Sequence, residues 1–86
     1  MYEINHSKVT VMTDRGVALS LSYSVLVDEA QAPTRYGVRV AELSTGELAE
    51  ALDVTSKPER AHELIGQLAR NTVTPTTLAD VVGDWL

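Results

Sequence analysis

The clearest pattern in the chain is an alternation of apolar and small polar side chains between residues 17 and 27. Successive side chains of a β-strand point to opposite faces of the sheet, so this alternation predicts a strand with one buried and one wet face. The buried face would carry Val17, Leu19, Leu21, Tyr23, Val25 and Val27. The wet face would carry Ala18, Ser20, Ser22, Ser24 and Leu26.

Three further segments are predicted to be strands. Lys8–Met12 would form a hairpin with the alternating strand through the turn Thr13–Gly16, and the first seven residues, which break its phase, are expected to be loosely held. In Arg35–Ala41 the apolar residues share one face. Leu48–Val54 contains strong helix formers, but its shortness and the preceding Thr-Gly turn favour a strand.

After residue 55 the apolar period becomes helical. Ser56–Glu59 supplies an N-cap serine, an early proline and a capping-box glutamate for a helix over about residues 57–70. Asn71 is expected to end this helix in the left-handed conformation. Thr74–Pro75 would begin a second helix over about residues 75–86. The apolar stripes of the two helices are Ala61, Leu64, Ile65, Leu68 and Ala69, and Leu78, Val81, Val82 and Trp85.

These elements predict an α+β fold in one domain, residues 1–86. A four-stranded antiparallel β-meander over about residues 8–54 would be followed by a C-terminal α-helical hairpin packed on one sheet face. Gly37, in the middle of a strand, is expected to mark a bulge or a close approach of two backbones. The predicted core is Val17, Leu19, Leu21, Tyr23, Val25, Val38, Val40, Leu52, Leu64, Ile65, Leu68, Leu78, Val81, Val82 and Trp85.

Composition excludes several classes of function. The chain has 86 residues, no cysteine and a net charge of −5. Disulfides, thiolate metal sites and thiol chemistry are therefore excluded, and an acidic chain without a Lys/Arg block is unsuited to nucleic acid or an anionic membrane. The glycines form no phosphate-binding loop, so we expect no cofactor. No apolar run approaches the ~20 residues of a transmembrane helix and no signal-peptide pattern is present, so we expect a cytoplasmic protein.

One candidate for catalysis is a pair of carboxylates in the last predicted helix. Asp80 and Asp84 lie four residues apart on one helix face, and with His62 they could form the site of a small metal-dependent enzyme. The favoured interpretation is that the two aspartates are the wet side of an amphipathic helix and that His62 faces solvent. We therefore expect a protein that is not an enzyme, with no catalytic residue and no metal.

The candidate binding site lies on the predicted wet face of the sheet. Arg35 and Arg39 would lie beside Ser22 and Ser24, and arginine forks suit carboxylate or phosphate partners. The alternative is that the arginines pair across the sheet with Glu42, Glu47 or Glu50. The leading hypothesis is a small non-enzymatic interaction or regulatory module that binds another protein or a second copy of itself. Nucleic-acid binding would require Lys8 to join the two arginines in one positive patch.

The later part of the chain resembles a known family. Tyr36-Gly37-Val38, Asp53-Val54-Thr55 and above all Thr74–Leu86 are similar to a domain-of-unknown-function family of short, uncharacterised proteins from Gram-positive, mostly clostridial, bacteria. The likeness covers about residues 23–86, and the chain departs from the family pattern at Thr77, often histidine, and Gly83, often glutamate. The resemblance implies a strand-then-helix architecture, favours a strand at 48–54, implies a bacterial cytosolic origin and brings no activity.

Overall fold

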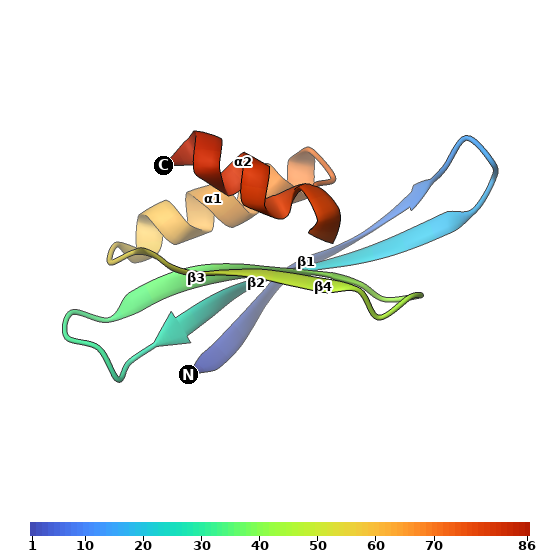
Figure 1. The fold of residues 1–86 in the computed structure, drawn as a ribbon. Helices are drawn as coiled ribbons and strands as arrows, with labels where there is room; N and C mark the ends of the chain where they lie inside the picture. Colours follow the sequence, from blue (N-terminus) through green and yellow to red (C-terminus); the bar gives the residue numbers. More distant parts are fainter.

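The computed structural model describes residues 1–86 and contains one antiparallel sheet and two C-terminal helices (Figure 1). The strands lie side by side in chain order, β1-β2-β3-β4. Their bounds are Tyr2–Met12 for β1, Ala18–Asp28 for β2, Arg35–Glu42 for β3 and Leu48–Thr55 for β4. Helix α1 spans Pro58–Arg70, a short 3-10 turn η1 spans Pro75–Thr77, and α2 spans Leu78–Trp85.

The antiparallel meander and the α+β class are confirmed, and so is the strand at residues 48–54. The helix-forming composition of β4 does not prevent it from pairing along β3, with Ala41 opposite Leu48 and Val38 opposite Ala51. Cross-strand pairing thus overrides local propensity in this short segment. No helix is long and apolar enough to span a membrane.

The first strand begins at Tyr2, so the expectation of a loosely held start was wrong. Tyr2 lies opposite Val27 and Glu3 opposite Leu26, whereas the register shifts between Asn5 and Ser7. This irregularity is a β-bulge, in which one extra residue changes which face the following side chains occupy. The break in the apolar phase near His6 therefore marks the bulge and not the end of the strand.

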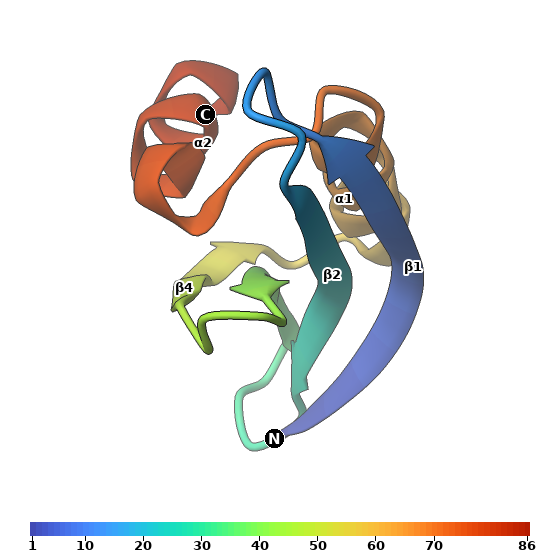
Figure 2. The ribbon, with the colours of Figure 1, turned by 90° about the vertical axis from the view of Figure 1, so that its right-hand side faces the viewer.

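The core lies between one sheet face and the helices. Figure 1 shows both helices above the sheet, and Figure 2 shows α2 on the β4 side and α1 on the β1 side. The cluster of buried apolar residues is Leu21, Tyr23, Val25, Val27, Val38, Val40, Ala61, Leu64, Ile65, Leu68, Val73, Leu78 and Val82. Val81 and Trp85 are partly buried against it. Burying these apolar side chains is the main favourable contribution to folding.

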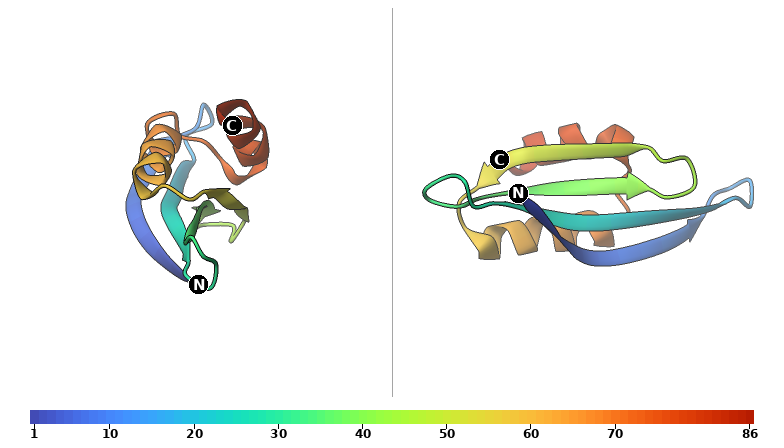
Figure 3. Two further views of the ribbon diagram at one scale, coloured as in Figure 1. Left: turned by 90° about the vertical axis from the view of Figure 1, so that its left-hand side faces the viewer. Right: turned by 90° about the horizontal axis from the view of Figure 1, so that it is seen from below.

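Two residues of the predicted core are exposed instead. Val17 is 55% exposed, because it precedes β2 near the tip of the β1–β2 hairpin, which extends beyond the helices (Figures 1 and 3). Leu52 is 56% exposed, because it lies on the same face of β4 as Leu48, whereas Ala49 and Ala51 pack against the core. Leu19 is only partly buried. Conversely, the prediction omitted Val27, Ala61 and Val73, all of which belong to the core.

The ends of α1 differ from the sequence prediction. Lys57, not Ser56, is the N-cap residue, and no side chain caps the helix. The hydroxyl of Thr55 instead accepts a hydrogen bond from the Lys57 backbone N–H at 3.1 Å. At the other end the left-handed residue is Thr72, with φ 48°, whereas Asn71 has φ −93°.

Candidate functional site

The second face of the sheet lies opposite the helices and carries the predicted binding residues. Figure 3, in its right-hand view, shows the strands from this side, in front of both helices. The strand registers place Ser24 opposite Asn5 and Arg39, and Ser22 opposite Lys8 and Ala41. We call this surface the open face, defined by Glu3, Asn5, Lys8, Ser20, Ser22, Ser24, Leu26, Arg35, Gly37, Arg39, Ala41, Leu48, Glu50 and Leu52.

Arg39 lies near the middle of the open face, between two carboxylates. Its Nη1 donates to Glu3 Oε1 at 3.0 Å, and its Nη2 and Nε donate to Glu50 Oε2 at 2.7 and 3.2 Å. The hydrogen bonds to Glu50, with Glu3 close by, raise the pKa of Arg39. Arg39 therefore pairs across the sheet with Glu50, which was the predicted alternative to a free binding site. Its second partner, Glu3, was not predicted. Glu42 instead binds the backbone and hydroxyl groups of the following turn.

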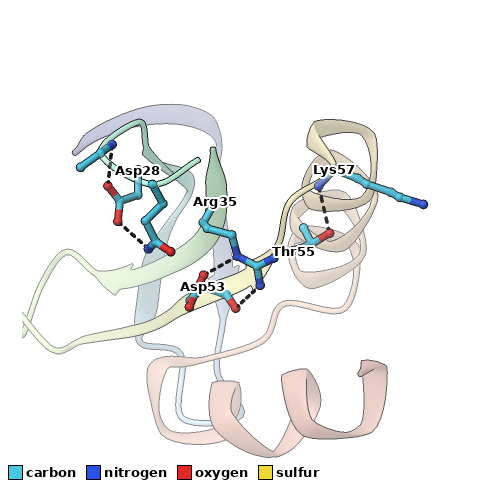
Figure 4. A network of polar contacts seen from close by, with 7 residues as sticks. Asp28, Arg35, Asp53, Thr55 and Lys57 are labelled. Carbon is cyan, nitrogen blue, oxygen red and sulfur yellow. Dashed lines mark hydrogen bonds and ion pairs between the residues drawn. The ribbon is translucent and has the colours of Figure 1, made fainter. Parts of the chain in front are cut away.

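Arg35 is held by a different carboxylate, at the end of the sheet shown in Figure 4. Its Nε donates to Asp53 Oδ1 and its Nη2 to the Asp53 backbone oxygen at 3.0 Å. Asp53 has a positive φ of 58°, in the left-handed region that asparagine and aspartate tolerate best among residues other than glycine. Beside it, Asp28 accepts hydrogen bonds from Gln31 Nε2 at 2.9 Å and Ala30 N at 3.1 Å. The hydrogen bond from Gln31 is the main cause of a lowered pKa of Asp28.

The two serines of the predicted site have different surroundings. Ser24 is buried, with 1% of its surface exposed, and lies between Asn5 and Arg39 in the strand register. Ser22 is half-buried and its hydroxyl accepts a hydrogen bond from Asn5 Nδ2 at 2.9 Å. The serines therefore support the surface around Arg39, and neither makes a hydrogen bond to Arg35 or Arg39.

Leu26 is a residue of this face that the sequence prediction had placed on the wet side without further role. It is only 2% exposed, although it lies outside the main core cluster. One cavity of about 220 Å³ is lined by Met1, Leu26, Asp28, Gln31, Arg35, Gly37, Leu52 and Asp53. A second, of about 260 Å³, is lined by Met1, Tyr2, Glu3, Leu26 and Arg39. The uninterrupted apolar run Val25–Val27 was the available signal, because such a run indicates burial on both faces.

The alternative metal site is not assembled from the predicted residues. Asp80, Asp84 and His62 are all exposed on the helices. No group of three or more His, Cys, Asp or Glu side chains is placed to hold a metal ion. Asp84 lines a surface hollow of about 410 Å³ with Gln67, Val81 and Trp85. This lining contains one ionisable side chain, so it provides no pair of catalytic carboxylates.

The positive patch required for nucleic-acid binding is likewise interrupted. Arg39 pairs with Glu3 and Glu50, and Arg35 pairs with Asp53, so carboxylates lie among the cations. A phosphate backbone would meet negative charge beside each guanidinium, which opposes such binding. The open face is a mixed, internally paired surface.

Comparison with known proteins gives one match. The model of a family of unknown function (DUF6514) matches residues 2–86, which is nearly the whole chain. No curated protein and no solved structure matches it.

Proposed function

The chain belongs to the family of unknown function DUF6514, and we propose that it is a non-enzymatic interaction or regulatory module whose open face binds another protein. The proposal is carried by one observation. The face opposite the helices holds an ordered ion-pair network next to exposed aliphatic side chains. This arrangement has the two components of a protein interface, which are apolar area to bury and polar groups that fix the orientation of the partner.

The polar component is preorganised. Arg39 on β3 connects Glu3 on β1 with Glu50 on β4, so its guanidinium is already fixed before any partner arrives. Side chains that are ordered in the free protein lose less conformational entropy on binding. The arginines still have N–H groups beyond those used in these pairs, because each guanidinium has five.

The apolar component consists of leucines that the helices do not cover. Leu48 and Leu52 on β4 are 54% and 56% exposed, and Leu43, which follows β3, is 48% exposed. Single exposed leucines are common on protein surfaces, but Leu48 and Leu52 flank Glu50 of the ion-pair network, each two residues away along β4. Their burial under a partner would supply the hydrophobic part of the binding free energy.

In this proposal the partner is a different protein. Binding of a second copy of the chain is the alternative, and it is tested first. A two-fold dimer would use the same face on both copies. Sedimentation equilibrium over a range of protein concentrations measures this directly. A mass that stays monomeric at high concentration removes the dimer variant and leaves a heterologous partner.

The open face is tested by capture of partners from a lysate of the host organism on immobilised protein. Leu48→Glu adds a charge to the face without breaking an ion pair, and Arg39→Glu reverses the central charge. Arg70→Glu, at the exposed end of α1, is the matched control for the charge change. A partner held by the wild type and by Arg70→Glu should be lost from both face variants, each shown to be folded by circular dichroism. Undiminished capture by the folded face variants would contradict the proposal.

A further inference from the structure

The two cavities on the open face adjoin at Leu26. Both are lined by Leu26 and Met1, and they extend from Arg35 and Asp53 at one end to Glu3 and Arg39 at the other. Leu26 lies opposite Glu3 on β1 and opposite Gly37 on β3. Because Gly37 has no side chain, the β4 backbone at Ala51 and Leu52 packs closely against it, and Gly37 and Leu52 both line the hollow beside Leu26. We call this feature the Leu26 groove.

The cavity beside Gly37 is small. Small-molecule sites usually have volumes of ~300–1,000 Å³. The cavity beside Gly37, at about 220 Å³, is smaller and suits a single side chain of a partner. Its apolar wall is formed by Met1, Leu26 and Leu52, so an aliphatic side chain would fill it best.

The charge of the groove determines which partner residues can lie next to this aliphatic side chain. The side chains that line the groove include three carboxylates, Glu3, Asp28 and Asp53, and two guanidinium groups, Arg35 and Arg39. The carboxylate of Glu50 pairs with Arg39 from outside the groove. Both arginines already have carboxylate partners, so an added anion would have to displace one of them.

Asp28, in contrast, forms no ion pair, and one oxygen of Asp53 and one of Glu3 accept no hydrogen bond. An incoming cation therefore finds unused carboxylate oxygens. The net charge of −5 on the whole chain attracts the same kind of partner over longer distances.

We infer that the Leu26 groove binds a basic peptide segment, which places an aliphatic side chain against Leu26 and Leu52 and a lysine or arginine beside the groove carboxylates. The inference rests on the proposed function of the open face and names the class of partner. It also assigns the two arginines a structural role, because they order the groove carboxylates and do not themselves bind an acidic ligand.

The test uses three capped tripeptides, acetylated and amidated, titrated into the full chain and followed by amide and methyl NMR shifts. Lys-Leu-Lys is the expected ligand, Glu-Leu-Glu reverses its charge and Lys-Gly-Lys removes its aliphatic side chain. We expect millimolar binding of Lys-Leu-Lys, with shifts at Leu26, Gly37 and Leu52, and binding of the other two weaker by about tenfold or more, which corresponds to ~1.4 kcal/mol.

Two leucines of β4 give a matched pair of variants. Leu52 lines the groove and Leu48 does not, although both lie on the open face with nearly equal exposure. Leu52→Ser should weaken Lys-Leu-Lys binding about threefold or more, and Leu48→Ser should leave it unchanged. Equal effects of the two substitutions would overturn the groove as the binding site.

Other outcomes also overturn the inference. They are equal or tighter binding of Glu-Leu-Glu, equal binding of Lys-Gly-Lys, or no shift with Lys-Leu-Lys at tens of millimolar. If one of these is found while Leu48→Glu and Arg39→Glu still abolish capture of a partner, the open face remains the interaction site and only the partner chemistry is wrong. If Lys-Leu-Lys binds as expected while those variants capture partners normally, the proposed function fails and the groove remains a peptide site.

Discussion

Gly37 lies so close to Ala51 on the neighbouring strand that a β-carbon on residue 37 would overlap the Ala51 carbonyl oxygen. The register explains this contact, because Val38 pairs with Ala51 but Tyr36 pairs with Thr55, so β4 contains extra residues opposite Gly37. The bulge folds over the glycine. Within it Asp53 has a positive φ and pairs with Arg35, and Leu52 lines the groove beside Gly37, so the close approach at Gly37 bears on both the ion pair and the groove.

Gly37→Ala should therefore destabilise the protein. The β-carbon would meet backbone, which cannot move aside as a flexible side chain can, and such overpacking costs about 1–3 kcal/mol. Urea unfolding measures the change. The control is Gly83→Ala in α2, where a β-carbon has no neighbour within 4 Å and the helix should gain up to about 1 kcal/mol. A Gly37→Ala protein as stable as the wild type would contradict the close approach.

The two bulges mark where sequence reasoning about the fold succeeds and fails. Strand alternation and helical periodicity locate every element, because these patterns are local. A bulge exchanges the two faces of a strand, and nothing in the apolar pattern says how many residues loop out. Strict alternation puts Leu48, Leu52 and Val54 on one face, but β4 changes phase after Leu52, so the two leucines lie on the open face and Val54 packs against the core. Leu52 was placed in the core because the small Ala49 and Ala51, on the other face, were not recognised as the core side. Gly37 was the usable signal for the second bulge.

The candidate site was predicted only in part for a related reason. The alternation of side chains in β3 correctly predicted that Arg39 lies on the open face, and Glu50 was among its expected partners. Its other partner, Glu3, lies in a segment that was expected to be loosely held and reaches Arg39 only because β1 extends to Tyr2. Long-range pairs of this kind depend on strand order and register, which composition does not specify.

Tyr23→Phe should cost about 1–2 kcal/mol. The Tyr23 side chain is fully buried and its hydroxyl donates a hydrogen bond of 2.9 Å to the backbone oxygen of Val73, in the segment after α1. Phenylalanine fills the same space but leaves a carbonyl without its donor, and such unpaired buried groups are costly. Tyr36→Phe is the control, because the Tyr36 hydroxyl makes no hydrogen bond within the protein. Equal urea midpoints for the two variants would contradict the role of the Tyr23 hydroxyl.

Glu42 should make stability depend on acidic pH. Hydrogen bonds from the hydroxyl of Ser44 and from Thr45 lower the pKa of Glu42 from 4.5 to about 2. A carboxyl whose pKa is lower in the folded state stabilises the protein above pH 4.5, and this contribution is lost as the pH falls from about 4.5 to about 2. Glu42→Gln should therefore be less stable than the wild type at pH 6, with a difference that shrinks toward pH 2.

The measurement is thermal unfolding of both proteins across this pH range, with a carboxyl NMR titration of Glu42. Glu47→Gln, at an exposed position in the same turn, is the matched control and should show little difference at any pH. A gap between wild type and Glu42→Gln that stays constant from pH 6 to pH 2 would show that the carboxylate is not what the turn requires.

Trp85 and Leu86 should differ in what they contribute, although both lie at the end of α2. Trp85 is partly buried against the core and the Arg60 guanidinium lies 4.4 Å from the centre of its ring, whereas Leu86 is 76% exposed. We expect Trp85→Ala to cost about 2–3 kcal/mol, less than for a fully buried tryptophan, and Leu86→Ala to stay within ~0.5 kcal/mol.

Arg60→Ala should cost ~0.5–1 kcal/mol, the range of an exposed cation–π pair. In a domain of this size each kcal/mol shifts Tm by roughly 4–8 °C, so melting curves resolve the three variants. The double variant Arg60→Ala/Trp85→Ala completes a double-mutant cycle. If Arg60→Ala costs as much without Trp85 as with it, the stacking of Arg60 on Trp85 contributes nothing to stability. A change in Tm for Leu86→Ala equal to that for Trp85→Ala would contradict the docking of the tryptophan.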